Sequence, residues 1–378
     1  MRVLVLAEYP SLNGGERSFL EAARRITASD VQIVVAAPAL GPLAQSLRRY
    51  NLPHVPFEPF DDRGARYGRP RLREQIADCM AHSRAELLHA NSLSMSRLAG
   101  PVGAALGVPG LGHLRDMMGV SRVSVEDLNQ HRCLLAVSQA TRQWYVDAGL
   151  DESKVRVAYN GVDGRRFRPR PPRGVLHQAL NIPRQCMLVG SVGQIGMRKG
   201  VDLYVDAAAR IASRRSDVHF IHVGQRYSRK QEAVAFEEDV LRAANRGPLQ
   251  GRFHFLGPRD GVERVLNEFD VYVHSARQEP LGRVLLEAGA SGLPIVATEV
   301  GGTREIFPRS DDAALLVAPQ SSVALGDAVE MLLSSPAARR AIGANARRRV
   351  TTAFDIHMAS RQLEYWYRHA GALNRSTA

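Results

Sequence analysis

Short apolar runs alternate with longer amphipathic stretches along almost the whole chain of 378 residues, and this alternation limits the possible folds more than any other feature. The runs are nearly continuous in apolar character, which is typical of strands buried on both faces of a parallel sheet. The stretches between them have the spacing of helices that cover such a sheet. The sequence therefore predicts an α/β fold. The predicted strands are Val3–Ala7, Val31–Ala37, Glu86–Ala90, Leu134–Val137, Met187–Val192, Val218–Val223, Val271–His274 and Pro294–Ala297. The predicted helices include Arg17–Arg25, Gln139–Ala148, Tyr204–Ser213, Val284–Ala290 and Val323–Leu333.

The alternation is interrupted once, at the segment Arg165–Gly174, which is rich in proline and arginine. Such a segment neither pairs in a sheet nor continues a helix, so it is predicted to be a linker. We place a domain boundary there, between residues 168 and 169. The two parts are predicted to be doubly wound domains, in which ligands bind at the carboxyl ends of the strands. Two such domains in tandem favour a ligand held in the cleft between them.

The composition excludes several classes of protein. Hydrophobic residues make up 45% and charged residues 23%, a balance typical of globular proteins rather than disordered or fibrous ones. The apolar run near the start is about five residues long, shorter than the core of a secretory signal, and no run approaches the roughly 18 residues of a spanning helix. The three cysteines, Cys79, Cys133 and Cys186, match neither a disulfide framework nor a zinc site. We therefore expect a cytoplasmic protein in a reducing compartment.

The net charge is +12, and 47 of the 50 basic residues are arginine. The excess is spread evenly along the chain, whereas a nucleic-acid-binding protein gathers its basic residues into a stripe. It favours anionic partners in general, such as a membrane surface or a phosphorylated substrate, and no nucleic acid is expected. Two interpretations of the segment Asp61–Arg73 stay open: contact with an anionic acceptor or lipid headgroups, or a mobile solvated loop. Its arginines are Arg63, Arg66, Arg69, Arg71 and Arg73.

The first predicted strand is followed by a glycine-containing junction, Ser11–Arg17. Asn13 is a suitable N-cap, and Glu16 three residues later completes a pattern typical of a capping box. Gly14 and Gly15 would leave the amides at the helix start unobstructed, so that an anion could approach them closely. The alternative is that the glycines only form a tight turn.

A second junction of this kind, Gly193–Gly200, follows the predicted strand Met187–Val192 and precedes a helix that we expect to begin near Val201. Arg198 and Lys199 are adjacent cations on this loop, suitable for holding a diphosphate, and an arginine can make a bidentate contact. The glycine spacing does not fit the P-loop of nucleoside triphosphatases. The alternative is a solvated basic turn.

The segment Glu279–Ala288 is the most informative part of the chain. We expect its helix to begin near Leu281, with free backbone amides at Leu281, Gly282 and Arg283 that could meet a sugar or phosphate oxygen. Glu279 would lie just before the helix and Glu287 about two turns along it. Two glutamates on a helix are usually just solvated. However, the surrounding Val284–Ala290 is nearly all apolar, so Glu287 is expected to be a buried carboxylate that needs a hydroxyl or cation partner.

Taken together, these motifs resemble those of the retaining GT-B glycosyltransferases of family 4. Glu279 and Glu287 have the spacing of that family's E-x7-E motif. The other matching segments occur in family order from about residue 1 to residue 306. They are Gly14–Glu16, His89–Ser92, Val137–Ser138, Asn160–Asp163 with Phe167 and Pro169, Lys199–Gly200, Gly289–Thr298 and Gly301–Gly302.

The resemblance implies a GT-B architecture, in which two Rossmann-like domains flank an interdomain cleft. It implies an acceptor-side domain over residues 1–168, a nucleotide-sugar domain over 169–355, and a last helix within 356–378 that packs back on the first domain. It also implies transfer of a sugar with retained anomeric configuration and no required metal or other cofactor. The donor is then expected to be a nucleoside-diphosphate sugar, with UDP as the expected nucleotide, and the acceptor a hydroxyl group.

The resemblance also assigns roles to individual residues. Glu279 would contact the donor sugar and Glu287 the ribose hydroxyls. Lys199 would neutralise the diphosphate, helped by backbone amides at Gly14 and Gly15. His113 would lie near the transferred sugar, after a strand of the first domain, and would act through its side chain or its carbonyl. Fixed cations and amides of this kind can stabilise the leaving diphosphate in place of a metal ion.

The chain departs from the family pattern at Gln194, where arginine is usual, and we expect Arg198 to supply the missing charge. Two alternatives to a glycosyltransferase remain at this point. One is a UDP-sugar 2-epimerase on the same fold, against which the E-x7-E spacing and Lys199-Gly200 argue. The other is a non-catalytic nucleotide-sugar-binding protein, favoured only by Gln194. The basic charge is compatible with a peripheral position of the protein at the inner face of the membrane.

Overall fold

The computed structural model describes residues 1–26 and 30–372. The chain forms two compact units, one made of residues 1–161 and the segment from Ile356 onward, the other of Val162–Asp355. The segment Arg165–Gly174 is not a free linker, because it packs within the second unit. Phe167 is buried, the amide of Arg170 donates to Asn267 Oδ1 at 2.6 Å, and the amide of Arg173 donates to Glu268 Oε1 at 2.8 Å. The chain therefore enters the second unit at Val162, before the predicted boundary.

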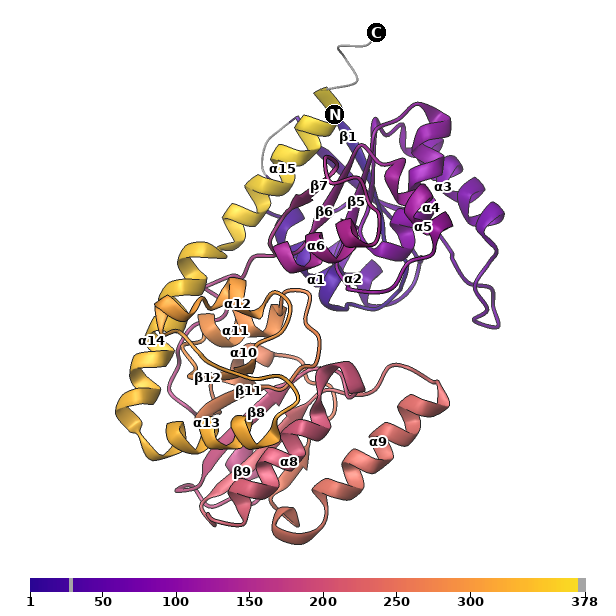
Figure 1. Ribbon diagram of the computed structural model, residues 1–378. Helices are drawn as coiled ribbons and strands as arrows, with labels where there is room; N and C mark the ends of the chain where they lie inside the picture. Colours follow the sequence, from indigo (N-terminus) through magenta and orange to yellow (C-terminus); the bar gives the residue numbers. More distant parts are fainter. Residues whose placement is uncertain (27–29, 373–378) are drawn as a thin grey trace. The chain divides into compact units, whose positions relative to one another are not determined.

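Helices and strands alternate in each unit (Figure 1). The strands are β1 Arg2–Leu6, β2 Gln32–Ala37, β3 His54–Pro56, β4 Leu87–Ala90, β5 Gly110–Leu114, β6 Cys133–Ala136, β7 Val155–Val157, β8 Met187–Val192, β9 Val218–Val223, β10 Phe253–Phe255, β11 Val271–His274, β12 Ile295–Thr298 and β13 Leu315–Val317. The helices are α1 Gly14–Ala23, α2 Pro42–Arg49, α3 Arg69–Ser83, α4 Leu93–Leu106, α5 Arg122–Asn129, α6 Gln139–Asp147, α7 Val175–Ala179, α8 Val201–Ala212, α9 Gln231–Ala244, α10 Val262–Leu266, α11 Arg283–Ala290, α12 Thr303–Ile306, α13 Ser322–Ser334, α14 Pro336–Ala353 and α15 Ile356–Ala372.

The first unit contains a seven-stranded parallel sheet in the order β3-β2-β1-β4-β5-β6-β7. Side chains of a strand alternate between the two faces, and β1 shows this alternation clearly. Val3 and Val5 pack with α1, α2 and α15 on one face, whereas Leu4 and Leu6 pack with α3 and α4 on the other. Burial on both faces explains why the runs are apolar throughout rather than alternating with polar residues.

The second unit contains a six-stranded parallel sheet in the order β10-β9-β8-β11-β12-β13. Its largest apolar cluster joins β8, β9 and β11 to α8 and α13. Both sheets are thus doubly wound and parallel, which confirms the predicted fold class of two Rossmann-like domains. In each sheet the order reverses beside the strand that begins the unit, between β1 and β4 in the first and between β8 and β11 in the second. These reversals are where such sheets bind ligands.

The last helix, α15, packs on the first unit, in which the described part of the chain ends (Figure 1). The Ser360 hydroxyl donates to the carbonyl oxygen of Ala22 at 2.9 Å, and Tyr367 is fully buried against the sheet. Residues 373–378 of the expected C-terminal segment lie outside the described residues.

The arginines of Asp61–Arg73 are not a loose solvated cluster. Arg66 pairs with the buried Glu8 at 2.8 Å, and Arg69 and Arg73 both pair with Asp127, at 3.5 and 3.0 Å. The Arg71 guanidinium lies over the ring of Tyr67, 3.6 Å from its centre. The second half of the segment forms the first turn of α3 instead of a loop. Three of the five arginines therefore already have a carboxylate partner within the unit, which weakens both interpretations left open by the sequence.

The described part of the chain contains no helix that is both long enough and apolar enough to cross a bilayer. The three cysteines are free thiols. Cys79 and Cys133 are buried, and burial raises the pKa of each to about 11.

Two buried histidines predict a loss of stability in mild acid. Burial lowers the pKa of His131, in the first unit, and of His222, in the second, to about 4. In the unfolded chain the same side chains take up a proton below about pH 6.5. Stability should therefore fall as the pH drops from about 6.5 towards 4, by about 2 kcal/mol per histidine at pH 5. Urea unfolding at pH 7.5 and pH 5 measures this difference.

His222→Phe tests the contribution of one of these histidines. Phenylalanine keeps a ring of similar size and removes the titrating group, at the cost of the contact between the imidazole and the Gly193 backbone. The second unit of this variant should lose less stability between pH 7.5 and pH 5 than that of the unaltered protein. An identical loss in both proteins would contradict the assignment.

Candidate functional site

The residues predicted to bind a ligand lie at the carboxyl edge of each sheet, next to the reversal of strand order. In the second unit, the loop after β8 carries Arg198 and Lys199, and the loop after β11 carries Glu279. Because β8 and β11 are neighbouring parallel strands, the two loops start side by side. In the first unit, Gly14 and Gly15 follow β1, and His113 lies on β5.

Lys199 and Glu279, 80 residues apart in sequence, form an ion pair in the second unit. Lys199 Nζ lies 2.5 Å from Glu279 Oε2. The same oxygen accepts a hydrogen bond from His274 Nε2 at 2.9 Å. Glu279 is 5% exposed, so the carboxylate is held in an almost dry environment by two donors on one oxygen. Both contacts use Oε2, and Oε1 makes no hydrogen bond with the residues that the structure describes.

The electrostatics of this cluster fix its charge state. Burial alone would raise the pKa of Glu279, but Lys199, His274 and Arg198 together lower it well below its usual range. Burial lowers the pKa of His274 despite the neighbouring carboxylate. At neutral pH Glu279 is therefore a carboxylate and His274 a neutral imidazole. The imidazole carries its proton on Nε2, which donates to Glu279.

Backbone and side-chain contacts hold the two loops together. The carbonyl oxygen of Arg198 accepts from the amide of Arg277 at 2.9 Å, and the Arg277 guanidinium makes two bonds to the Asp202 carboxylate, at 2.7 and 2.6 Å. Gly200 has a φ of +61°, and a Cβ there would lie 2.0 Å from the carbonyl oxygen of Ser275. Glycine is required at this position because the loops approach so closely. The Lys199 side chain is thereby set beside Glu279.

Gly301 and Gly302 hold Glu279 from the other side. The amide of Gly302 donates to the carbonyl oxygen of Glu279 at 3.0 Å. Gly301 has a φ of +49°, and a Cβ there would lie 2.0 Å from that same oxygen. The Gly301-Gly302 motif thus helps to fix the position of Glu279. The sequence of the motif alone does not indicate this role.

Gly301→Ala should displace Glu279 and destabilise the second unit. The added methyl group cannot share the space of the Glu279 carbonyl, and the left-handed backbone adds strain, so we expect a loss of about 1–3 kcal/mol. Thermal unfolding measures the loss. Gly196→Ala is the matched control, because Gly196 has extended backbone and a Cβ there would meet no atom within 4 Å. Equal melting temperatures for the two variants would show that the close approach is not essential.

Glu287 also lies in the second unit, but with a different partner. It is 7% exposed and accepts a hydrogen bond from Arg283 Nε at 2.8 Å on Oε1. The expected buried carboxylate is therefore present, and its cation lies one turn earlier on the same helix. The helix begins at Arg283 rather than near Leu281, because Gly282 has a φ of +107° and serves as the N-cap. Leu281 is buried in the preceding loop.

The two remaining predicted residues of this unit differ in their surroundings. Arg198 belongs to a single 3-10 turn, Met197–Lys199, and is near enough to Glu279 to help lower its pKa. Gln194 is exposed on the loop after β8. The structure thus places a cation on this loop at Arg198, four residues after the position where the family has one.

In the first unit, Gly14 is the first residue of α1, with Asn13 as N-cap. The amide of Asn13 donates to Glu16 Oε2 at 3.1 Å, which confirms the predicted capping box. A Cβ on Gly14 would meet no atom within 4 Å, whereas one on Gly15 would lie 3.1 Å from Cδ of Arg115. The amides at the start of α1 are thus unobstructed at Gly14 and flanked by an arginine at Gly15.

His113 lies within β5, not after it as the sequence suggested, and belongs to a chain of buried polar side chains. Arg115 Nη2 donates to His113 Nδ1 at 3.2 Å. His89 Nε2 lies 3.3 Å from the same Nδ1, and His89 Nδ1 lies 2.8 Å from the hydroxyl of Tyr367 on α15. Burial, helped by Arg115, lowers the pKa of both histidines well below the usual value, so both are neutral.

This geometry fixes the tautomer of each histidine. Arginine can only donate, so His113 Nδ1 is an acceptor and the proton lies on Nε2. His89 Nε2 must then donate to that same Nδ1, and its own Nδ1 accepts from Tyr367. What remains is His113 Nε2–H, a buried donor with no hydrogen-bond partner in the described parts of the chain. Such a donor is costly to leave unpaired, which makes it a candidate contact for a ligand.

Sequence reasoning did not assign a role to four of the residues in these clusters. His274 ends a predicted strand five residues before Glu279, a signal that could have identified it. His89 lies in a recognised motif, but its bond to Tyr367 joins residues 278 positions apart and leaves no trace in the sequence. Arg115 follows β5, which was not predicted. Within residues 1–26 and 30–372, no three His, Cys, Asp or Glu side chains gather as metal ligands do.

Comparison with known proteins supplies the family. The model of the family described as Glycosyltransferase Family 4 matches residues 12–166, and that described as Glycosyl transferases group 1 matches residues 185–335. The chain belongs to the group 1 glycosyltransferases of family 4. The resemblance identified from the motifs is thereby confirmed.

Several relatives of this chain are named as glycosyltransferases. The chain is 28% identical to the lipopolysaccharide core biosynthesis mannosyltransferase LpsB of Rhizobium meliloti over 212 residues. This aligned segment covers 56% of the chain and 60% of the relative. The chain is 31% identical over 232 residues to a D-inositol 3-phosphate glycosyltransferase of Kineococcus radiotolerans, covering 57% and 52%. The matched segments thus span little more than half the length of these relatives.

The fold of this family member is shared with a solved structure. Anabaena HepE in complex with UDP-glucose superposes with a TM-score of 0.86 over 98% of this chain and 100% of HepE, at 23% sequence identity. At that identity the likeness concerns the fold, and it confirms the GT-B class expected for the two Rossmann-like domains.

Proposed function

We propose that this protein is a retaining glycosyltransferase that transfers a sugar from a UDP sugar to a hydroxyl acceptor and requires no divalent cation. The observation that carries the proposal is the buried cluster of Lys199, His274 and Glu279 at the reversal of strand order in the second sheet. Family membership supports sugar transfer, and the UDP complexes of HepE support the choice of nucleotide.

The proposed chemistry follows from the charges of the second unit. Breaking the bond between the sugar and the diphosphate leaves additional negative charge on the diphosphate. Lys199 has two N–H groups beyond the one that it gives to Glu279, and Arg198 adds a second cation, so the two can stabilise this charge. Glu279 Oε1 would accept from hydroxyls of the donor sugar. Glu287 Oε2 would accept from the ribose, since Oε1 is used by Arg283. Leu281, Gly282 and Arg283 would present their amides beside the donor.

The first unit supplies the remaining proposed contacts. The amides of Gly14 and Gly15 at the start of α1 are suited to a phosphate oxygen, since the positive end of a helix dipole lies there. His113 would donate from Nε2 to a hydroxyl of the transferred sugar. A neutral imidazole with its proton on Nε2 is the form required for that role.

Calorimetric titration tests the donor class. UDP, GDP, ADP and TDP are each titrated in EDTA into the unaltered protein and into Glu287→Gln, which keeps the size of the side chain. We expect UDP to bind selectively without metal and the variant to bind it at least about tenfold more weakly, because a charged acceptor for the ribose is lost. Glu330→Gln, an acidic residue on α13 paired with Arg214, is the control and should bind as the unaltered protein does.

The outcomes separate the candidate functions. Binding of no nucleotide would overturn the proposal, and equal binding of all four by both proteins would remove the role of Glu287. Binding that requires a divalent ion would contradict the metal-free site. Retention is tested by proton NMR of donor hydrolysis, in which water takes the place of the hydroxyl acceptor. The sugar first formed should keep the anomeric configuration that it had in the donor.

A further inference from the structure

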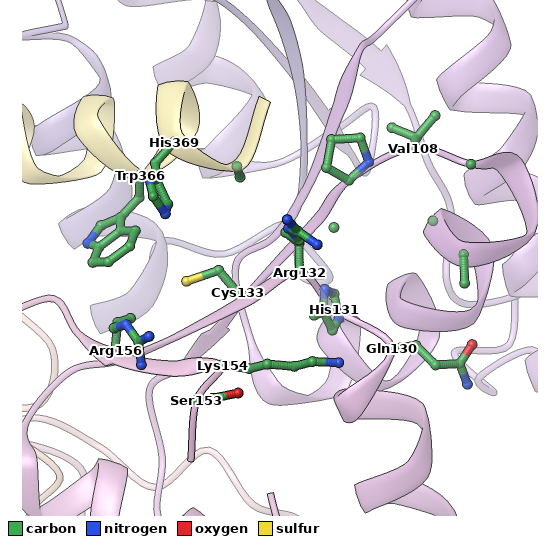
Figure 2. A pocket seen from close by; sticks show the side chains of 16 residues that line it. Val108, Gln130, His131, Arg132, Cys133, Ser153, Lys154, Arg156, Trp366 and His369 are labelled. Carbon is green, nitrogen blue, oxygen red and sulfur yellow. The ribbon is translucent and has the colours of Figure 1, made fainter. Parts of the chain in front are cut away.

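The first unit has a cavity of about 550 Å³ at the amino edge of its sheet, opposite to the edge that carries His113 and Gly15. It is bounded by the starts of β5, β6 and β7, by the last turn of α4 and by α15 (Figure 2). The strands rise about 3.3 Å per residue, so Gly110 and Leu114, at the two ends of β5, lie about 13 Å apart. None of the candidate site residues lines this cavity. It is therefore a separate feature of the unit.

The cavity is lined by positive charge without a carboxylate. Arg132, Lys154 and Arg156 are among its sixteen lining residues, and none of the sixteen is Asp or Glu. Arg132 precedes β6 and Lys154 precedes β7, and these strands are neighbours in the sheet. The nearest acidic side chain to act on them is Asp151, outside the lining, whose pKa is lowered chiefly by hydrogen bonds from Ser153 and only to a lesser extent by Lys154 and Arg156. This contrasts with the arginines of α3, which pair with Asp127.

The usual reason for cations at this edge accounts for only one of the three. Helices end here, and cations stabilise the negative ends of helices. Lys154 Nζ does so by donating to the carbonyl oxygen of Asn129, the last residue of α5, at 2.5 Å. The last turn of α4 is closed by its own backbone, with the amide of Val108 donating to Gly103. Among the described residues, the Arg156 guanidinium donates to the carbonyl oxygens of Glu152 and Val155, at 3.3 and 3.2 Å. Stabilisation of a helix end therefore does not explain the guanidinium groups of Arg132 and Arg156.

An aromatic wall completes the cavity. Trp366 and His369 lie on the α15 side, with Lys154 and Gln130 on the opposite side and Arg132 between them (Figure 2). The rings of Trp366 and His369 pack edge to face with centres 5.7 Å apart. Glycines 103, 107 and 110 line the cavity as well, so that part of its wall is bare backbone. The volume falls in the range of small-molecule sites, about 300–1,000 Å³.

We propose that this cavity binds a phosphate ester, with Arg132 and Arg156 on the phosphate and Trp366 against the organic part. Guanidinium groups match the geometry of phosphate oxygens and hold them by charge-assisted bonds. Like charges gathered in one place repel one another, and an anion bound between them relieves that repulsion. The indole of Trp366 beside them suits a compact ring or a headgroup. The ester is either a soluble molecule or the headgroup of an anionic lipid, and the chemistry recognised is the same.

Two probes distinguish these sources. Glucose 6-phosphate is titrated calorimetrically as a soluble ester. Sedimentation with vesicles of phosphatidylcholine, with and without phosphatidylglycerol, tests the headgroup. Trp144→Phe leaves Trp366 as the single tryptophan, so its fluorescence reports whether the soluble probe enters this cavity.

The decisive variant is Arg132→Ala/Arg156→Ala, compared with Arg48→Ala/Arg49→Ala. Both pairs are exposed in the first unit and both remove two positive charges, but only the first pair lines the cavity. We expect saturable binding of at least one probe, weakened at least about tenfold by the first double substitution and unchanged by the second. Binding of glucose 6-phosphate with a change in Trp366 fluorescence would identify a soluble ester. Binding only to vesicles that contain phosphatidylglycerol would identify a headgroup.

Three results would overturn the proposal. Neither probe binds, or the first double variant binds both probes as the unaltered protein does, or the second double variant loses as much affinity as the first. The last result would mean that general positive charge, not this cavity, attracts the anion. The test does not depend on sugar transfer, because binding alone is measured.

Discussion

Lys199→Met is expected to weaken the binding of UDP about a hundredfold and to leave the binding of uridine unchanged. The ammonium group acts on the diphosphate in the proposed site, whereas uridine has no phosphate for it to contact. Removing one partner of a nearly buried, hydrogen-bonded charge pair commonly costs about 2–5 kcal/mol in binding. Calorimetry with UDP and with uridine separates the two contributions within one variant.

The same substitution should also lower the stability of the second unit. Glu279 is 5% exposed, and without Lys199 its Oε2 keeps the hydrogen bond from His274 but loses its ion-pair partner. An uncompensated buried charge is costly, so we expect a loss of about 3 kcal/mol in unfolding free energy. The double variant Lys199→Met/Glu279→Gln should regain part of this loss, because the charge left behind is also removed, but should not regain UDP affinity.

Lys230→Met is the matched control for both measurements. Lys230 is the only other lysine of the second unit, is largely exposed, and lies 3.9 Å from Glu232. It should change neither UDP affinity nor stability. If Lys199→Met weakens uridine as much as UDP, the effect is a general distortion of the site, and the role of Lys199 on the diphosphate is wrong.

The sequence predicts best the elements whose local pattern and burial agree. Strands β8, β9 and β11 have the predicted bounds, and α8 begins at the predicted Val201, because each is a continuous apolar run or an amphipathic stretch next to a glycine. The short strands β3, β7, β10 and β13 have only three residues each and were not predicted. Three residues carry too little periodicity to distinguish a strand from a loop.

Strand β5 was missed for a different reason. Its sequence, Gly-Leu-Gly-His-Leu, has two glycines, which normally weaken a strand. The structure explains them: a Cβ on Gly110 would lie 2.8 Å from His131 Nδ1, and one on Gly112 would lie 2.7 Å from Leu134 Cδ2. The glycines are there because neighbouring side chains occupy that space. Such a requirement comes from tertiary packing and cannot be derived from local sequence.

The candidate site was predicted residue by residue through family motifs, but not its internal contacts. The spacing of Glu279 and Glu287 does not reveal that the first pairs with Lys199 across two loops and the second with Arg283 on its own helix. The arginines of Asp61–Arg73 show the same limit. Their positive charge is visible in the sequence, whereas their partners Glu8 and Asp127 are brought near only by the fold.

His113→Ala is expected to lower kcat/KM for transfer about a hundredfold, because the proposed donor to the sugar is removed. His113→Gln should retain more activity than His113→Ala, since its amide nitrogen can reach nearly the position of Nε2. Because the pKa of His113 lies well below its usual value, the imidazole stays neutral across pH 6–8. The rate should therefore show no titration of this group in that range. A loss of activity on deprotonation near pH 6.5 that is abolished in His113→Gln would instead indicate an acid–base role.

The hydrogen-bond chain behind His113 predicts a smaller, more selective effect for Tyr367→Phe. The variant removes the hydroxyl that donates to His89 and leaves Arg115 on His113. His89 then holds His113 less firmly, and we expect kcat to fall several-fold with little change in donor affinity, as for a positioning residue. Tyr365→Phe, on the same helix but 55% exposed, should have no effect.

Nitrogen-15 NMR of the histidine rings checks the premise directly, without any substrate. Both His89 and His113 should carry their proton on Nε2, the arrangement dictated by the one-way donation of Arg115. A proton on Nδ1 of His113 would be incompatible with that contact and would reverse the direction of the chain. In Tyr367→Phe, the signal of His89 should shift more than that of His113, because Arg115 continues to fix the second ring.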